Sequence, residues 1–208
     1  MKSLNNWLLV LSVLSCFGCS SPVHEDDRGC AFVSDSIQYR VEFMSAGCVR
    51  ILSFPEGDTL VTKRLVVDSE KPAFKDYKWE DTGQKLLFRT RELSVVFDKA
   101  DAAFIFQETS TGKLLLKEKG DRKARNFKRS VAGGEQCLEV TQRFVPTEDE
   151  AIYGLGQYQN GIMNYRGKSV LLLQANMDIV NPFLISTNGY GVLWDNYSST
   201  KFEDTKES

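Results

Sequence analysis

Apolar and polar residues alternate along much of the chain, and this period of two predicts β-strands. In residues 37–43 every second side chain is apolar, and residues 48–54 follow after a short connection that contains Gly47, which predicts a hairpin. Similar runs recur at a spacing of roughly ten residues, which is typical of antiparallel sandwiches. They cover residues 86–90, 93–98, 103–108, 113–118, 136–144, 169–173, 183–187 and 191–194.

Helical patterns are scarce. Residues 121–129 are rich in basic side chains and poor in apolar ones, so we expect a solvated loop there. Residues 146–150 could form one helical turn with Thr147 as its cap. The predicted fold class is all-β, an antiparallel β-sandwich. A (β/α)8 barrel needs about 250 residues, so the 208 residues of this chain exclude one.

The N-terminus has the features of an export signal. Residues 7–17 are an apolar run, which is too short for a membrane span of about 20 residues but fits a signal peptide. Gly18-Cys19 then resembles a bacterial lipobox, so we expect a lipoprotein signal peptide at 1–18 and lipidation of Cys19. Cys16 is a second candidate for the lipid.

The residues after Cys19 are short, polar and acidic, and residues 19–29 are predicted to be a solvated tether before a sandwich over residues 30–208. The acidic run resembles the segments that direct lipoproteins to the outer surface of Bacteroidetes-like bacteria. The expected location is the outer membrane or cell surface, with the periplasm as an alternative. Membrane contact is expected only through the lipid.

Composition excludes several kinds of chemistry. The net charge of −2 gives no basic footprint, so no nucleic-acid partner is expected. The one histidine, His24, lies in the predicted tether, which disfavours histidine-dependent hydrolysis and zinc chemistry. Neither a metal nor a cofactor is expected. Cys30, Cys48 and Cys137 do not have the spacing of a metal site. Cys48 and Cys137 are expected to be buried. One disulfide among the three is possible, but the sequence does not assign it.

Carboxylates are the remaining candidates for chemistry. Glu148, Asp149 and Glu150 are adjacent, which favours a solvated turn. Asp178 lies between two apolar runs and fits either a loop cap or a ligand contact. Several tyrosines cluster in the last third of the chain, where they could stack on sugars or fill the core.

Sequence motifs in residues 150–157, 160–167, 181–186 and 189–195 resemble the N-terminal domain of glycoside hydrolase family 31, the α-glucosidases and α-xylosidases. The resemblance implies a β-sandwich similar to galactose mutarotase. Gly154 and Gly156 suit a tight backbone path, and Gly189 suits a hairpin or bulge. Pro182 suits the start of a strand, where no ladder N–H is needed.

The resemblance also implies a site. In this family a loop of the sandwich reaches over the catalytic barrel and touches the sugar, and the matching loop is residues 174–179. Asn176 and Asp178 are therefore the expected substrate-binding residues for an α-linked xyloside or glucoside. An amide and a carboxylate suit hydrogen bonding to neighbouring hydroxyls.

Both catalytic aspartates of the family lie in the barrel, the nucleophile in a Trp-x-Asp-Met-Asn-Glu-like segment that this sequence lacks. No catalytic residue is therefore assigned, and the chain alone is expected to be inactive. We interpret it as a truncated enzyme that needs a barrel in cis or encoded nearby. The alternative is a stand-alone cell-surface carbohydrate-binding or interaction module. Sugar specificity and oligomeric state stay open.

Overall fold

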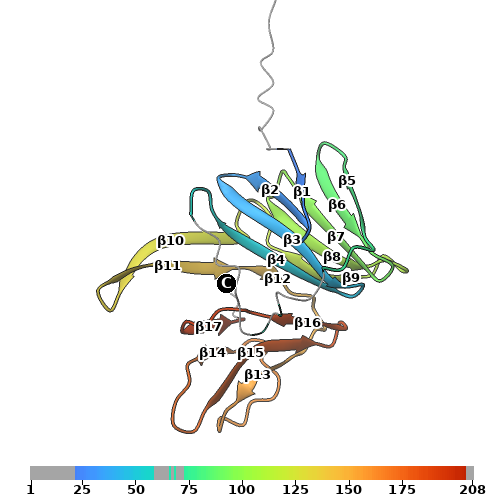
Figure 1. Ribbon diagram of the computed structural model, residues 1–208. Coiled ribbons are helices and arrows are strands. Elements are labelled where there is room, and N and C mark those ends of the chain that lie inside the picture. Colours follow the sequence, from blue (N-terminus) through green and yellow to red (C-terminus); the bar gives the residue numbers. More distant parts are fainter. Residues whose placement is uncertain (1–21, 59–65, 67, 69–72, 205–208) are drawn as a thin grey trace, which may run out of the picture.

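The computed structural model describes residues 22–58, 66, 68 and 73–204, and these residues form strands joined by turns (Figure 1). The predicted signal peptide, Cys16 and Cys19 lie outside this range. Within the described residues there is no helix, and hence none that is long and apolar enough to cross a membrane. The expected helical turn at 146–150 is a non-helical turn.

The first layer is a four-stranded antiparallel sheet in the order β1-β2-β3-β4. The alternation in residues 37–43 turns Tyr39, Val41 and Phe43 into the core, where each is at most 1% exposed. The predicted hairpin is confirmed as β3 and β4. The strands are β1 (His24–Glu25), β2 (Cys30–Ser34), β3 (Ile37–Ser45) and β4 (Cys48–Pro55).

The second layer is a six-stranded antiparallel sheet in the order β12-β9-β8-β7-β6-β5. Aromatic side chains of both layers meet between the sheets, with ring centroids 4.8 Å apart for Phe32 and Phe97 and 4.9 Å apart for Phe97 and Phe104. Two sheets packed over such a core form the predicted sandwich. The strands are β5 (Lys78–Asp81), β6 (Lys85–Arg89), β7 (Leu93–Asp98), β8 (Ala103–Glu108), β9 (Leu114–Glu118) and β12 (Phe144–Val145).

A two-stranded hairpin, β10 (Arg125–Ala132) and β11 (Glu135–Gln142), projects from the sandwich (Figure 1). The expected loop at 121–129 is confirmed for residues 121–124, which form turns, but is wrong for residues 125–129, which belong to β10 and show no apolar alternation. The hairpin is instead stabilised by eight residue pairs between β10 and β11. The predicted strand at 136–144 is divided at Arg143, after which β12 joins the larger sheet.

The last third of the chain forms a smaller unit. A three-stranded sheet in the order β13-β15-β16 lies beside the pair β14-β17. Their shared core is small, with Ile152, Leu155, Tyr165 and Leu172 buried. The strands are β13 (Ile152–Gln157), β14 (Ser169–Leu172), β15 (Ile179–Ser186), β16 (Tyr190–Leu193) and β17 (Thr200–Glu203).

Two local expectations are wrong. Val23 packs against the main core and β1 pairs with β2, so ordered structure begins inside the stretch expected to be a tether. Cys48 and Cys137 are exposed, while Cys30 is buried. Cys48 follows directly after the β3–β4 turn, and Cys137 lies on the projecting hairpin. Both cysteines therefore lie in strands, as predicted, but at positions that are not buried. All three thiols are free.

Candidate functional site

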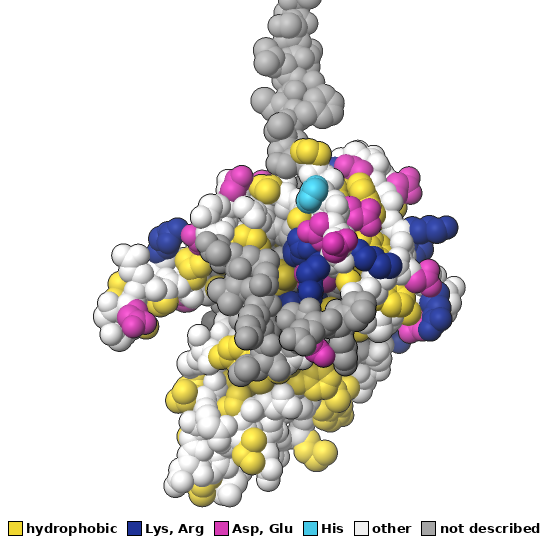
Figure 2. Space-filling model, in the orientation of Figure 1, with side chains coloured by type: hydrophobic (Ala, Val, Ile, Leu, Met, Phe, Trp, Pro, Cys, Tyr) yellow, Lys and Arg dark blue, Asp and Glu magenta, His cyan; other side chains and the backbone are white. Residues whose placement is uncertain are grey.

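One side of the β13-β15-β16 sheet exposes apolar side chains. On β15 alternate residues point outward, including Ile179 at 58% and Ile185 at 51% exposure. Tyr153 of β13 is paired with Ile185, and Leu193 of β16 is paired with Phe183, so these residues share that side. We call these five residues the apolar face. Figure 2 shows hydrophobic side chains gathered over the part of the molecule where Figure 1 places β15 and β16.

Glycines let the strands of this sheet approach closely. A Cβ on Gly154 would lie 2.5 Å from the Phe183 carbonyl oxygen, and one on Gly156 would lie 2.1 Å from that of Ile179. Their φ angles of +103° and +118° also disfavour side chains. The expectation of a tight backbone path is confirmed. The expectation that Pro182 starts a strand is wrong, because Pro182 lies within β15, where the pairing with β13 changes register.

Glu150 organises the turn that leads into this sheet. Its carboxylate accepts hydrogen bonds from the Ser186 hydroxyl at 2.5 Å, from the Tyr190 hydroxyl and from the Thr147 backbone N–H at 3.1 Å. Burial raises the pKa of Glu150, but the hydrogen bonds from Ser186, Tyr190 and Thr147 outweigh it and lower the pKa overall. The expectation of a solvated turn is therefore wrong for Glu150, which is 5% exposed.

The loop with the expected sugar contacts is held by its own backbone. Gln174 spans it, donating from Nε2 to the Asp178 carbonyl at 2.8 Å and accepting from the Val180 N–H at 3.1 Å. Ala175 and Asp178 form a bridge across the loop. Asn176 therefore lies at an exposed tip, and Asp178 is half-buried beside it.

The side chains of Asn176 and Asp178 make no hydrogen bond to any residue that the structure describes, so their polar atoms are available to a ligand. Burial raises the pKa of Tyr158, and the charges of Tyr165 and Asp178 add to this rise. The loop therefore presents an amide and a carboxylate that do not stabilise the fold through hydrogen bonds.

Apolar side chains surround this polar pair. Met177 at the loop tip is 65% exposed, and Leu173 and Leu171 on the approach from β14 are 50% and 54% exposed. The loop is also continuous with the apolar face through Ile179, the first residue of β15. The exposed Asn176, the half-buried Asp178 and the apolar face thus form one continuous surface.

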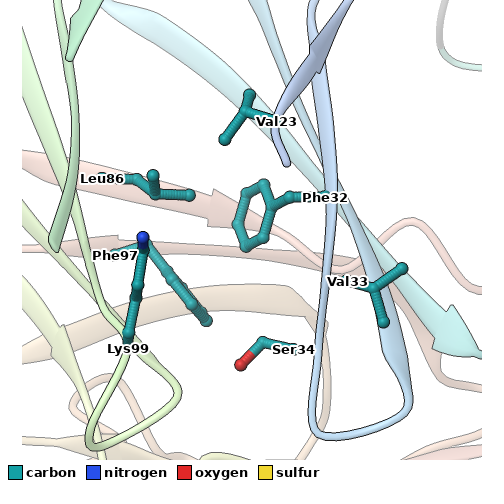
Figure 3. Close-up of a pocket in the computed structure, with 7 residues that line it drawn as sticks. All are labelled: Val23, Phe32, Val33, Ser34, Leu86, Phe97 and Lys99. Atoms are coloured by element: carbon teal, nitrogen blue, oxygen red, sulfur yellow. The ribbon is translucent and has the colours of Figure 1, made fainter. Parts of the chain in front are cut away.

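A separate pocket lies between the two layers of the sandwich, at the end where the described chain begins (Figure 3). Its volume of about 10 Å³ holds a water molecule at most, so it does not fit a sugar. In residues 22–58 and 73–204 no cluster of acidic, cysteine or histidine side chains has the arrangement of a metal site. The residues that line the pocket are Val23, Phe32, Val33, Ser34, Leu86, Phe97 and Lys99.

Comparison with known proteins gives concordant matches. Residues 38–203 match the family model of the glycosyl hydrolase 31 N-terminal galactose mutarotase-like domain. An α-xylosidase of Saccharolobus solfataricus is 34% identical over 178 residues, which cover 78% of this chain and 23% of that enzyme. An uncharacterised family 31 glucosidase of Pseudescherichia vulneris is 40% identical over 72 residues, or 35% of this chain and 13% of the relative.

Solved structures agree with this assignment. The family 31 α-xylosidase of Xanthomonas citri superimposes with a TM-score of 0.76 at 32% identity, over 86% of this chain and 19% of the enzyme. A soil-metagenome α-xylosidase in complex with xylose gives 0.71 at 24% identity, over 87% of this chain and 29% of that enzyme, which supports the fold.

The matches thus cover between 13% and 29% of the length of these relatives, 23% for the Saccharolobus enzyme. The resemblance in residues 150–195 and the galactose-mutarotase-like sandwich are both confirmed. The chain belongs to glycoside hydrolase family 31, and its described residues form the N-terminal galactose mutarotase-like domain of that family.

Proposed function

We propose that this domain supports and completes the sugar pocket of an α-glycoside hydrolase whose catalytic residues lie in another domain. The observation that carries the proposal is the continuous surface of the apolar face and the loop with Asn176 and Asp178. Apolar patches of this kind on a soluble domain mark interaction sites. The relatives are several times longer than this chain, so a catalytic domain is the occupant that we assign to the apolar face.

The proposed substrate is an α-linked xyloside or glucoside. The named relatives are α-xylosidases and a glucosidase, and one α-xylosidase structure contains xylose. Asp178 would accept hydrogen bonds from sugar hydroxyls, and the Asn176 amide would both donate and accept. Polar groups without protein partners discriminate well between hydroxyl patterns, because the wrong sugar leaves them desolvated and unpaired.

Hydrolysis with retention requires two carboxyl groups about 5–5.5 Å apart on either side of the glycosidic bond. Asp178 is the only acidic residue of the loop 174–179, so this loop does not supply such a pair. Its proposed role is binding, and the reacting carboxylates belong to the catalytic domain. The chain alone is therefore expected to leave aryl α-xylosides and α-glucosides intact.

The test is to produce the family 31 catalytic barrel encoded in the source genome with and without this chain and to measure hydrolysis of an aryl α-xyloside. We expect activity to depend on the chain, and Asp178→Ala to lower kcat/KM at least about tenfold, as for a lost sugar hydrogen bond. Turnover by the chain alone that disappears in Asp178→Ala would contradict the proposal. Equal activity of the barrel without the chain would also contradict it.

We also propose that the protein is exported and carries a lipid on Cys19. The supporting observation is the short apolar run followed by Gly18-Cys19. Mass spectrometry of the N-terminal peptide from a lipoprotein-processing bacterium tests this directly. Lipid on Cys16, or an unmodified N-terminus, would contradict the assignment of Cys19.

A further inference from the structure

The first described residues are fixed in the sandwich. Val23 packs against the main core. In β1, His24 pairs with Ala31, and Glu25 pairs with Cys30. The chain therefore enters the fold at the outer edge of the four-stranded sheet, at a defined point.

Two hydrogen bonds fasten Glu25 to the opposite layer. Its carboxylate accepts from the Tyr77 hydroxyl at 2.9 Å and from the Trp79 indole N–H at 2.8 Å. The hydrogen bond from Trp79, followed by that from Tyr77, lowers the pKa of Glu25, so the carboxylate is ionised at neutral pH. Trp79 lies on β5, and the entry point is thus held between β2 and β5.

Asp26 provides a second attachment of the N-terminal segment to the sandwich. Its carboxylate pairs with the Arg40 guanidinium and accepts the backbone N–H of Arg28 at 2.8 Å and of Gly29 at 3.2 Å. The hydrogen bond from Arg40 lowers the pKa of Asp26 to about 2. Two acids of the run Glu25-Asp26-Asp27 therefore attach the chain to the sandwich at its surface.

Val23 follows Cys19 by only four positions in the sequence. A fully extended chain covers about 3.5 Å per residue, so at most about 14 Å separates the two positions. We propose that the contacts of Glu25 and Asp26, together with this short connection, hold one end of the sandwich against the lipid bilayer. This is the end that contains β1, β2 and β5. This inference rests on the proposed lipidation of Cys19.

The proposal fixes an orientation. Figure 1 places β1 at one end of the molecule and β13 with β15 at the other. An anchored domain would therefore carry the apolar face and the Asn176–Asp178 loop at the end far from the membrane. A catalytic domain could bind there without competing with the bilayer, and the sugar site would face the medium.

The test uses the full-length precursor produced in a lipoprotein-processing bacterium. In a Cys48→Ser, Cys137→Ser background, a donor fluorophore is attached through Lys78→Cys on β5 or Gln157→Cys on β13, both exposed positions. Cys30 stays in place because it is buried, and its burial raises the pKa of the thiol to about 11. Energy transfer to an acceptor lipid is measured after the protein is incorporated into vesicles.

We expect several-fold higher transfer from Lys78→Cys than from Gln157→Cys. A flexible insertion of about twenty Gly and Ser residues after Ser20 should abolish the difference, because it frees the orientation. Equal transfer from both positions in the lipidated native-length protein would overturn the proposal. Mass spectrometry of the same samples separates this result from failed lipidation, which would overturn the anchor proposal and this inference with it. Neither result bears on hydrolysis by the assembled enzyme.

Discussion

Arg50 of β4 and Asp195 of the segment after β16 form an ion pair with a 3.7 Å separation. Arg50 also pairs with Glu42 at 3.3 Å, and Glu42 pairs with Arg40 at 2.8 Å. This row of alternating charges joins the four-stranded sheet to the unit that carries the apolar face. Arg50 and Asp195 are largely buried, with side chains 12% and 18% exposed, so solvent screens their interaction only in part.

Asp195→Ala should lower the free energy of unfolding by about 1–3 kcal/mol, because it leaves part of the Arg50 guanidinium buried without its partner. The exposed pair of Lys128 and Glu139 provides the control, and Lys128→Ala should change stability by less than about 0.5 kcal/mol. Urea unfolding measures both variants. Equal effects would contradict a special role for the buried pair.

Glu150→Gln should cost about 1–3 kcal/mol at neutral pH, because the hydroxyls of Ser186 and Tyr190 lose a charged acceptor. The folded-state pKa of Glu150 lies below its ordinary value of 4.5, so its contribution is complete above that value. The contribution is lost as the pH falls through the folded-state pKa. The difference between wild type and Glu150→Gln should therefore shrink below pH about 4.

The matched control for this prediction is the exposed neighbour Glu148, for which Glu148→Gln should leave stability nearly unchanged. Denaturant unfolding from acid to neutral pH gives the difference curves. A Glu150→Gln difference that grows as the pH falls would contradict the assigned network.

Gly156→Ala should destabilise the protein by more than about 3 kcal/mol or prevent folding of the small unit, because its Cβ would meet the Ile179 carbonyl oxygen at 2.1 Å. Gly161→Ala is the control. Gly161 also has a positive φ, +70°, but no neighbouring atom lies within 4 Å of a new Cβ. Only the conformational cost, about 1 kcal/mol, is expected there. Similar losses of unfolding free energy in the two variants would show that close approach is not what Gly156 provides.

Asp178→Ala should change stability by less than about 0.5 kcal/mol, because its carboxylate stabilises no described hydrogen bond. Gln174→Ala should lower the free energy of unfolding by about 1 kcal/mol or more. The reason is that the Gln174 side-chain amide makes hydrogen bonds to the backbone of both Asp178 and Val180. Thermal unfolding of the two variants checks this contrast. A large loss in Asp178→Ala would indicate a structural loop cap and would weaken its assignment to sugar binding.

Sequence periodicity predicted the sandwich strands well where one face is buried. Residues 93–98 and 103–108 were placed correctly because their apolar residues turn into a single large core. The β10–β11 hairpin was missed in part because neither of its faces is fully buried, and long-range pairing leaves no local pattern. Glu150 was misassigned for a related reason, since its partners Ser186 and Tyr190 lie far away in sequence and meet it only in the folded chain.

The candidate site was predictable only through family resemblance. The motif around Asn176 and Asp178 indicated the loop, but spacing alone could not distinguish a loop cap from a ligand contact. In the structure the Gln174 side chain holds the loop, whereas the Asp178 side chain makes no described hydrogen bond, and its role in sugar binding stays a prediction. The exposed state of the apolar face could not be predicted from periodicity, because a buried and an exposed alternating strand have similar sequences.

The most direct measurement of the central claim, that the apolar face is built to be covered, is sedimentation velocity of the residue 20–208 protein over a range of concentrations. We expect the wild type to self-associate and the double variant Phe183→Asp, Ile185→Asp to be a monomer with unchanged circular dichroism. The variants remove two exposed apolar side chains, so a correctly folded core should persist. A wild type that stays monomeric and binds xylo- or gluco-oligosaccharides saturably would contradict the account and favour a stand-alone carbohydrate-binding module.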